Sequence, residues 1–140
     1  MAGAAGRDTS LPVTQMPGVS FPVEVIDGMA VVAAPEEIDA ANAAGLRAAL
    51  LDAASHRKGT LVVDMSRTRF CDSSGLNVLV RAHRRAQTEG GEVLLVICAA
   101  AVLRLLALTG IDRVIPQFAS LDEALAQAPE PATRPPQPAS

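Results

Sequence analysis

Hydrophobic residues recur along the middle of the chain with two periods, one typical of β-strands and one typical of α-helices. Short runs rich in Val, Ile, Leu and Ala, bounded by Gly, Pro or Asp, predict strands. Longer segments in which apolar residues recur every three or four positions predict amphipathic helices. The strands predicted in this way are at residues 21–26, 29–33, 60–64, 93–97 and 114–115, and the helices are at 40–54, from 72–74 to 89, 100–109 and 121–128.

The order of these elements predicts an α/β fold. Strands that are linked through helices are normally parallel, with right-handed crossovers. The first two strands are joined by Asp27-Gly28, which suits the type I′ turn of an antiparallel hairpin. Pro22 places the first strand at an edge. We therefore expect a small mixed β-sheet packed with about four helices.

This pattern is confined to residues 19–128, which we expect to form a single domain. Residues 1–18 consist largely of Ala, Gly, Ser, Thr and Pro without a period, and predict a flexible N-terminal arm. Residues 129–140 include five prolines and predict a disordered tail.

One predicted helix start has more polar side chains than a helix cap requires. Asp72, Ser73 and Ser74 can each cap a helix by accepting hydrogen bonds from the free N–H groups of its first turn. Only one residue can be the cap, so at least one polar side chain is free for other work. Gly75 costs about 1 kcal/mol relative to Ala inside a helix, which suggests that something approaches the backbone closely there. A plain helix cap remains the simplest interpretation of the segment.

The wider sequence around this helix start resembles a known family. An aliphatic strand, the basic link at residues 66–69, then Phe70-Cys71-Asp72-Ser73-Ser74-Gly75-Leu76 and a helix are similar to the signature of the STAS domain. Within that family the chain resembles the bacterial anti-sigma factor antagonists. In these proteins a partner kinase phosphorylates the second Ser of Asp-Ser-Ser-Gly, and the matching residue here is Ser74.

Two further segments match the family, each with a departure. Glu37-Ile38-Asp39 is similar to the Glu-x-Asp element after the second strand, but the family's preceding Gly is replaced by Glu36. Asp39 is either a partner contact or a plain cap of the helix at 40–54. Before the helix at 100–109, Ala99-Ala100 replaces the family's Ser-Pro, which predicts a weaker cap.

The resemblance implies a partner-switching cycle. The unphosphorylated protein would bind an anti-sigma factor that is also a serine kinase, and so release a sigma factor for transcription. The kinase, with its own ATP and magnesium, would phosphorylate Ser74 and the complex would dissociate, after which a serine phosphatase would reset the protein. The residues expected to bind the partner are Asp39, Asp72, Ser73, Ser74, Gly75, Asn77 and Arg81.

Composition narrows the remaining possibilities. The net charge of −3 argues against a dedicated nucleic-acid-binding protein. Cys71 and Cys98 lack the spacing of a metal site. The sequence shows no signal peptide, and its longest apolar run, 93–103, is too short to span a bilayer. We therefore expect a cytoplasmic protein without membrane insertion, metal or cofactor.

The sequence lacks the residues that a serine hydrolase or a nucleotide-binding enzyme would need. A serine hydrolase needs a base, yet the chain has only His56 and His83 and no Gly-x-Ser-x-Gly sequence. His83 falls on the apolar side of its helix, where a packed histidine is expected, and no phosphate-binding Gly-rich loop is present. Arg81, Arg84 and Arg85 form a basic helix face, which is a solvated surface or one that a partner recognises. We expect a non-enzymatic regulator; the alternative is a STAS scaffold or ligand-sensing module without phosphorylation.

Overall fold

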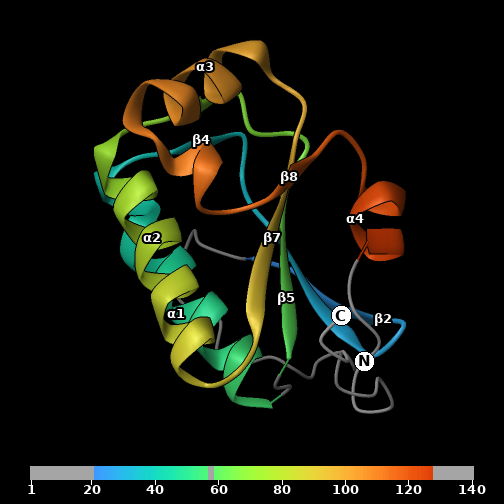
Figure 1. The fold of residues 1–140 in the computed structure, drawn as a ribbon. Helices are drawn as coiled ribbons and strands as arrows, with labels where there is room; N and C mark the ends of the chain where they lie inside the picture. Colours follow the sequence, from blue (N-terminus) through green and yellow to red (C-terminus); the bar gives the residue numbers. More distant parts are fainter. Residues whose placement is uncertain (1–20, 57–58, 128–140) are drawn as a thin grey trace, which may run out of the picture.

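The computed structural model describes residues 21–56 and 59–127, and a β-hairpin is the first element in this part of the chain (Figure 1). In the hairpin, β2 (Val23–Ile26) pairs antiparallel with β3 (Met29–Ala33). Asp27 and Gly28 have positive φ angles of 52° and 82°, as a type I′ turn requires. The predicted hairpin is therefore confirmed.

Within the described residues, the main sheet has five strands in the order β2-β3-β5-β7-β8. β5 (Thr60–Met65), β7 (Glu92–Ile97) and β8 (Gln117–Phe118) extend it, and every pair from β3 to β8 is parallel. The helices α1 (Ala40–His56) and α2 (Ser73–Thr88) make the crossovers that parallel strands need. β2 lies at the edge of the sheet, as Pro22 predicted. Because the β2–β3 pair is antiparallel and the others are parallel, the predicted mixed sheet is confirmed.

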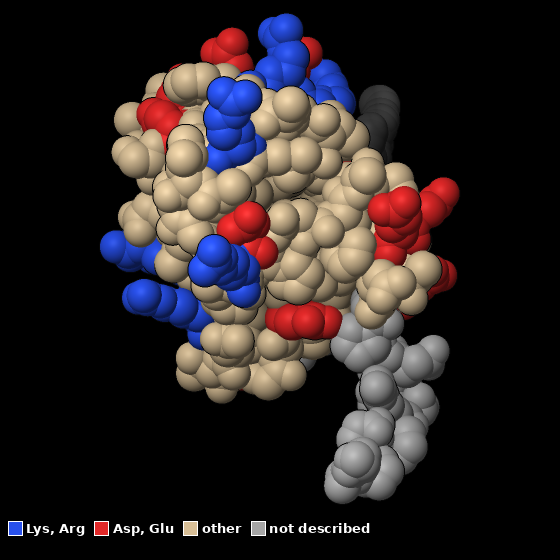
Figure 2. All heavy atoms as spheres, turned by 45° about the horizontal axis from the view of Figure 1, so that its top comes forward, with Lys and Arg blue, Asp and Glu red and all other residues tan. Residues whose placement is uncertain are grey.

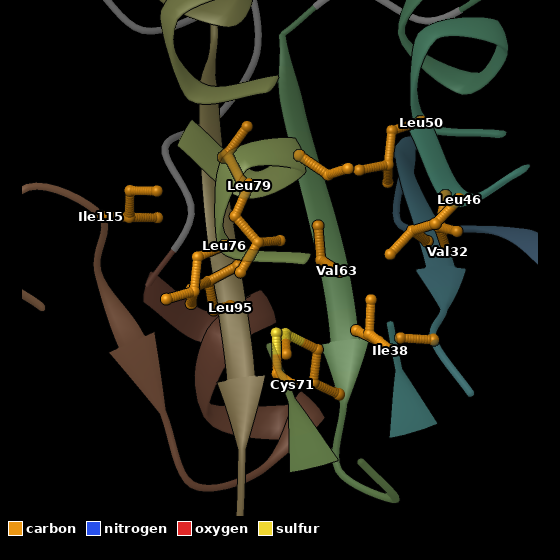
Figure 3. Close-up of a cluster of buried hydrophobic side chains, with 14 of the residues drawn as sticks. Val32, Ile38, Leu46, Leu50, Val63, Cys71, Leu76, Leu79, Leu95 and Ile115 are labelled. Carbon is orange, nitrogen blue, oxygen red and sulfur yellow. The ribbon is translucent and has the colours of Figure 1, made fainter. Parts of the chain in front are cut away.

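Helices cover both faces of this sheet. α1 and α2 lie side by side on one face, α4 (Leu121–Gln127) lies on the other, and α3 (Ala100–Thr109) lies across one end (Figure 1). Side chains of the central strand alternate between the two sides, so that Val63 joins the α1–α2 core while Val62 joins a smaller cluster with Ala124 of α4. Figure 3 shows Val63 among the aliphatic side chains of the larger core. The four helices in the described chain agree with the predicted α/β class and its single domain.

The predicted strand at 114–115 is wrong. Residues Ile111–Arg113 form a 3-10 helix, and the amide of Ile115 donates to the carbonyl of Ile111 at 3.0 Å. Ile115 is buried together with Ile111, one helical turn before it, whereas Val114 is 55% exposed, so the apolar pair Val114-Ile115 marks the end of a helical turn. The last strand, β8, starts only after Pro116.

The helix ends behave as their residues predict. Ser120 caps α4 by accepting a hydrogen bond from the amide of Glu123 at 3.1 Å. Ala99, at the start of α3, gives no side-chain hydrogen bond, so the weaker cap is confirmed. On the inner face of α1, Ala53 is buried, whereas Ala54 is only half-buried.

The predicted arm at 1–18 and the predicted tail at 129–140 lie outside the described residues. Within residues 21–56 and 59–127, no helix is both long and apolar enough to span a membrane.

Candidate functional site

A two-stranded parallel sheet, which the sequence analysis missed, organises the candidate site. β4 (Glu37–Ile38) pairs with β6 (Phe70–Cys71), with Glu37 opposite Phe70 and Ile38 opposite Cys71. The amide of Asp72 continues this pairing by donating to the carbonyl of Ile38 at 3.1 Å. The Glu-x-Asp element and the Asp-Ser-Ser-Gly segment, far apart in sequence, are thereby brought side by side.

The helices that follow these two short strands are each capped by an Asp. Asp72 Oδ1 accepts hydrogen bonds from the amides of Ser74 at 2.8 Å and Gly75 at 3.3 Å. Asp39 Oδ1 accepts one from the amide of Ala41 at 2.9 Å. The N-termini of α1 and α2 are therefore neighbours, and each holds a carboxylate in the positive field of its helix dipole. The capping role foreseen for Asp39 is confirmed, whereas its partner contact stays a prediction.

Because Asp72 is the cap of α2, both serines are released from that task. Ser73 is exposed and Ser74 is half-buried. Neither hydroxyl makes a hydrogen bond to any other residue that the structure describes. Two serine hydroxyls are thus presented at a helix N-terminus, a position that favours added negative charge.

Gly75 allows the first turn of α2 to pack directly against the small sheet. A Cβ at this position would lie 2.5 Å from Cys71 Sγ and 2.6 Å from Ile38 Cγ2, both well inside van der Waals contact. The close approach that the sequence suggested is therefore real, and it is made by the protein itself. Gly75 is buried, so it shapes the site from within.

Cys71 is a packing residue under the site. Burial, and then the neighbouring Asp72 carboxylate, raise the pKa of its thiol to about 11. The thiol stays protonated at neutral pH and is a poor nucleophile. Cys98, in contrast, is exposed.

The surface next to the motif combines one exposed aromatic ring with polar side chains. Phe70, on β6, is 51% exposed although aromatic residues are scarce in this chain. Ser73, Asn77 and Arg81 follow one another at four-residue spacing on α2, and Arg81 Nε lies 3.5 Å from Asn77 Oδ1. No role for Phe70 was predicted from the sequence. An aromatic residue two positions before Asp72, in a chain with few aromatic residues, could have indicated one.

Charged side chains border the motif on the segments before β4 and β6. Glu36 pairs with Arg67 at 3.9 Å and with Arg69 at 3.8 Å, in exposed contacts that contribute little to stability. Figure 2, in which the top of Figure 1 is turned forward, shows a mainly uncharged surface bordered by Lys, Arg, Asp and Glu. Leu103 and Leu108 of α3 are among the exposed apolar side chains.

The other candidate sites in the described part of the chain are a metal site and His83. No group of three His, Cys, Asp or Glu residues within it could hold a metal ion. His83 is 7% exposed and its Nδ1 has no hydrogen-bond partner there, so its predicted packed position is confirmed.

The fold and the Asp-Ser-Ser-Gly helix start define a STAS domain. The model of that family matches residues 20–124, and the chain belongs to the STAS domain family. A solved anti-sigma factor antagonist from Mycobacterium paratuberculosis is 32% identical, with a TM-score of 0.72 over 78% of this chain and 92% of that one. The resemblance to the antagonists is thus supported by sequence and by structure.

Two more distant structures share the fold. The Bacillus cell fate determinant SpoIIAA in its phosphorylated form is 21% identical, with a TM-score of 0.61 over 77% of this chain and 98% of that chain. A murine solute carrier 26 anion transporter, family member A9, is 22% identical, with a TM-score of 0.61 over 72% of this chain but only 18% of its own. The fold therefore makes up nearly all of the SpoIIAA chain but only a small part of the transporter chain.

Proposed function

We propose that this protein is an anti-sigma factor antagonist, switched off by phosphorylation of Ser74. In its unphosphorylated form it binds an anti-sigma factor that is also a serine kinase, and this binding releases a sigma factor. A serine phosphatase restores the active form. The protein itself is a regulator and not an enzyme, and it needs no cofactor.

The observation that carries this proposal is the division of tasks at the start of α2. Asp72 holds the helix, and the hydroxyl of Ser74 makes no hydrogen bond to any other described residue. A kinase can therefore modify Ser74 without removing the cap. The likeness to the mycobacterial antagonist, and to a protein solved in a phosphorylated form, supports the same assignment.

The local charges explain why a phosphate at Ser74 would act on a partner. A phosphoserine adds about −1.5 to −2 charges. The Asp72 carboxylate already accepts from the amides of Ser74 and Gly75, so the phosphate shares the helix end with an existing anion. Asp39 caps the adjacent helix. Phosphorylation thus adds negative charge and bulk beside the Asp72 and Asp39 carboxylates, and disfavours the bound state.

The proposed contact surface consists of Asp39, Ser73, Ser74, Asn77, Arg81 and Phe70, with Asp72 and Gly75 shaping it. Exposed aromatic and Arg side chains are the residues that most often dominate binding energy at interfaces. Phe70 lies beside the motif with about half of its surface exposed, at 51%. It is the residue of this set with the largest apolar area available to a partner.

The acceptor is tested by mass spectrometry. The Ser74→Ala chain, which cannot be released by phosphorylation, serves as bait to recover the kinase from the native cell. The recovered kinase is then incubated with the wild-type chain, ATP and magnesium, and phosphopeptides are sequenced. We expect phosphate on Ser74; phosphate mainly on Ser73 would overturn the assignment.

The switch is tested by binding titrations against the same kinase. Ser74→Ala should bind persistently with ATP present, and Ser74→Asp should bind weakly, although less weakly than phosphoserine because a carboxylate carries a single charge. Ser73→Ala is the matched control and should be released by ATP like the wild type. Equal affinities for the Ala, Asp and phosphorylated forms would instead favour a passive scaffold.

A further inference from the structure

A pocket of about 230 Å³ opens between α1 and α2, away from the phosphorylation site. Its lining residues from α2 and its C-cap run from Val78 to Glu89, while Ser74 lies in the first turn of the same helix. The pocket is therefore at the other end of α2 from the motif, beside the segments around Gly59 and Gly91. Of its lining residues, the partner-switching proposal uses only Arg81, and it gives the pocket itself no role.

The floor of this pocket is aliphatic. Leu50 of α1, Leu61 of β5 and Val78 of α2 are buried beneath it, and the smaller side chains Ala82 and Ala86 leave the space open. Among the residues that the structure describes, no aromatic side chain lines the pocket, and the whole chain has no Trp or Tyr. Such walls suit a flexible aliphatic chain better than a planar ring, which is usually held by aromatic stacking.

The rim is strongly basic. Arg47 from α1 and Arg81, Arg84 and Arg85 from α2 surround the opening, against the single acid Glu89, so the lining carries a net charge of 4 − 1 = +3. The whole chain has a net charge of −3, so cations are concentrated here. Arg85 is paired with Glu89 at 3.4 Å. Arg47 and Arg84 make no ion pair with any residue in the described ranges, and their guanidinium groups are available to a ligand.

The side of the pocket lined by Gly59 and Gly91 is fixed by close backbone packing. The amide of Glu92 donates to the carbonyl of Gly59 at 3.1 Å. A Cβ on Gly91 would collide with that same carbonyl, so the two glycine segments can meet only without side chains. The pocket thus has a built wall and is not merely a gap between two mobile helices.

We propose that this pocket binds a linear aliphatic carboxylate. The hydrocarbon chain lies on the floor formed by Leu50, Leu61 and Val78, and the carboxylate faces the guanidinium groups of Arg47 and Arg84. Arg and carboxylate can form paired, charge-assisted hydrogen bonds. The volume of about 230 Å³ lies below the 300 to 1,000 Å³ or so that is typical of larger ligands. A pocket of this size suits a small ligand.

The first experiment is a calorimetric titration of the unphosphorylated full chain with hexanoate, octanoate, decanoate and dodecanoate, each below its critical micelle concentration. The dissociation constant should fall about fourfold per added methylene, equivalent to about 0.8 kcal/mol, until the pocket is full, and then level off. Decanol and decylamine should bind at least tenfold more weakly than decanoate. An affinity that is independent of chain length, or equal for the amine, would overturn the proposal, as would binding of ATP in preference to the acids.

Matched variants locate the site. Arg84→Gln and Arg47→Gln should each weaken decanoate binding several-fold, whereas Arg104→Gln, an exposed arginine of α3 outside the pocket, should leave it unchanged. Ala82→Leu should block the floor, with the exposed Ala107→Leu as its control and circular dichroism as the folding check. Equal effects in the controls would mean that binding occurs elsewhere. Since no kinase is present, a negative result leaves the Ser74 proposal untouched.

Discussion

The position of a single cap decides what the motif can do. Three consecutive polar residues compete for the start of α2, and sequence alone does not choose among them. The carboxylate of Asp72 accepts two amide hydrogen bonds, at 2.8 and 3.3 Å, and places a full negative charge at the positive helix end. A serine hydroxyl offers no such charge. Asp72 therefore fixes the helix, and Ser74 is left available for modification.

Gly75 gives the sharpest stability prediction at the scale of a residue. Ala is the better helix former by about 1 kcal/mol, yet its Cβ would lie 2.5 Å from Cys71 Sγ and 2.6 Å from Ile38 Cγ2. Overpacking of this kind typically costs about 1 to 3 kcal/mol, so we expect a net loss in Gly75→Ala. Urea denaturation measures the change in the free energy of unfolding.

A double variant serves as the control for this prediction. Cys71→Ala removes the nearer of the two clashing atoms, so the combined variant should lose less stability than the sum of the single changes. A Gly75→Ala protein as stable as the wild type, or more stable, would show that the first turn of α2 does not pack tightly on the small sheet.

At the scale of elements, the β4–β6 pair is anchored by the loop that precedes β6. Thr68 is fully buried, and its hydroxyl donates to the carbonyl of Pro35 at 2.7 Å. The amide of Arg69 donates to the carbonyl of Glu36 at 2.8 Å. These bonds tie the segment before β6 to the segment before β4, and so hold the two capped helix ends together.

Replacing Thr68 by Val tests this anchor. Val keeps the shape of Thr but removes the donor, which deprives the Pro35 carbonyl of its hydrogen bond in a buried setting. The expected loss is about 1 to 3 kcal/mol in the free energy of unfolding. Thr88→Val is the matched control, because the Thr88 hydroxyl also bonds a carbonyl, that of Arg84 at 2.9 Å, but at an exposed position. The control should change stability by about 0.5 kcal/mol or less, and equal losses would argue against the anchor.

The elements also show how far sequence reasoning reaches. Long segments with a clear period, such as α2 and β7, were predicted nearly to the residue because their packing follows from that period. Two-residue strands such as β4 and β6 have no period and exist only through their pairing, so they were missed. Val114 and Ile115, which directly follow the 3-10 helix Ile111–Arg113, were mistaken for a strand because a short apolar run does not reveal its own period.

The candidate site divides in the same way. Asp72 and Ser74 could be predicted because capping chemistry and the family resemblance both depend on local sequence. The exposure of Phe70 and the packing of Gly75 against Ile38 depend on contacts between distant segments. The pocket between α1 and α2 was foreseen only as a basic helix face, because its floor needs both helices and β5 in place.

In the whole molecule, α2 carries residues of both proposed sites and is packed against the main core. Leu76 and Leu79 bury its inner side in the core shared with β5 and β7, as Figure 3 shows. Ser74 lies at its beginning, and the basic pocket lies along its later turns. Each site can therefore be changed at the surface while the core stays the same, which leads to the last prediction.

Phosphorylation of Ser74 should change the surface and leave the fold unchanged. A negative group at a helix N-terminus alters stability by only about 0.3 to 1 kcal/mol, and Asp72 remains as the cap. We expect the unphosphorylated, phosphorylated and Ser74→Ala proteins to give the same far-UV circular dichroism, and free energies of unfolding in urea that agree within about 1 kcal/mol. Leu79→Ala, which opens a cavity in the core next to α2, shows that the assay can detect damage, since it should cost about 2 to 5 kcal/mol. If the phosphorylated protein unfolded as easily as Leu79→Ala, the switch would act through the fold, and a surface mechanism based on charge and bulk would be wrong.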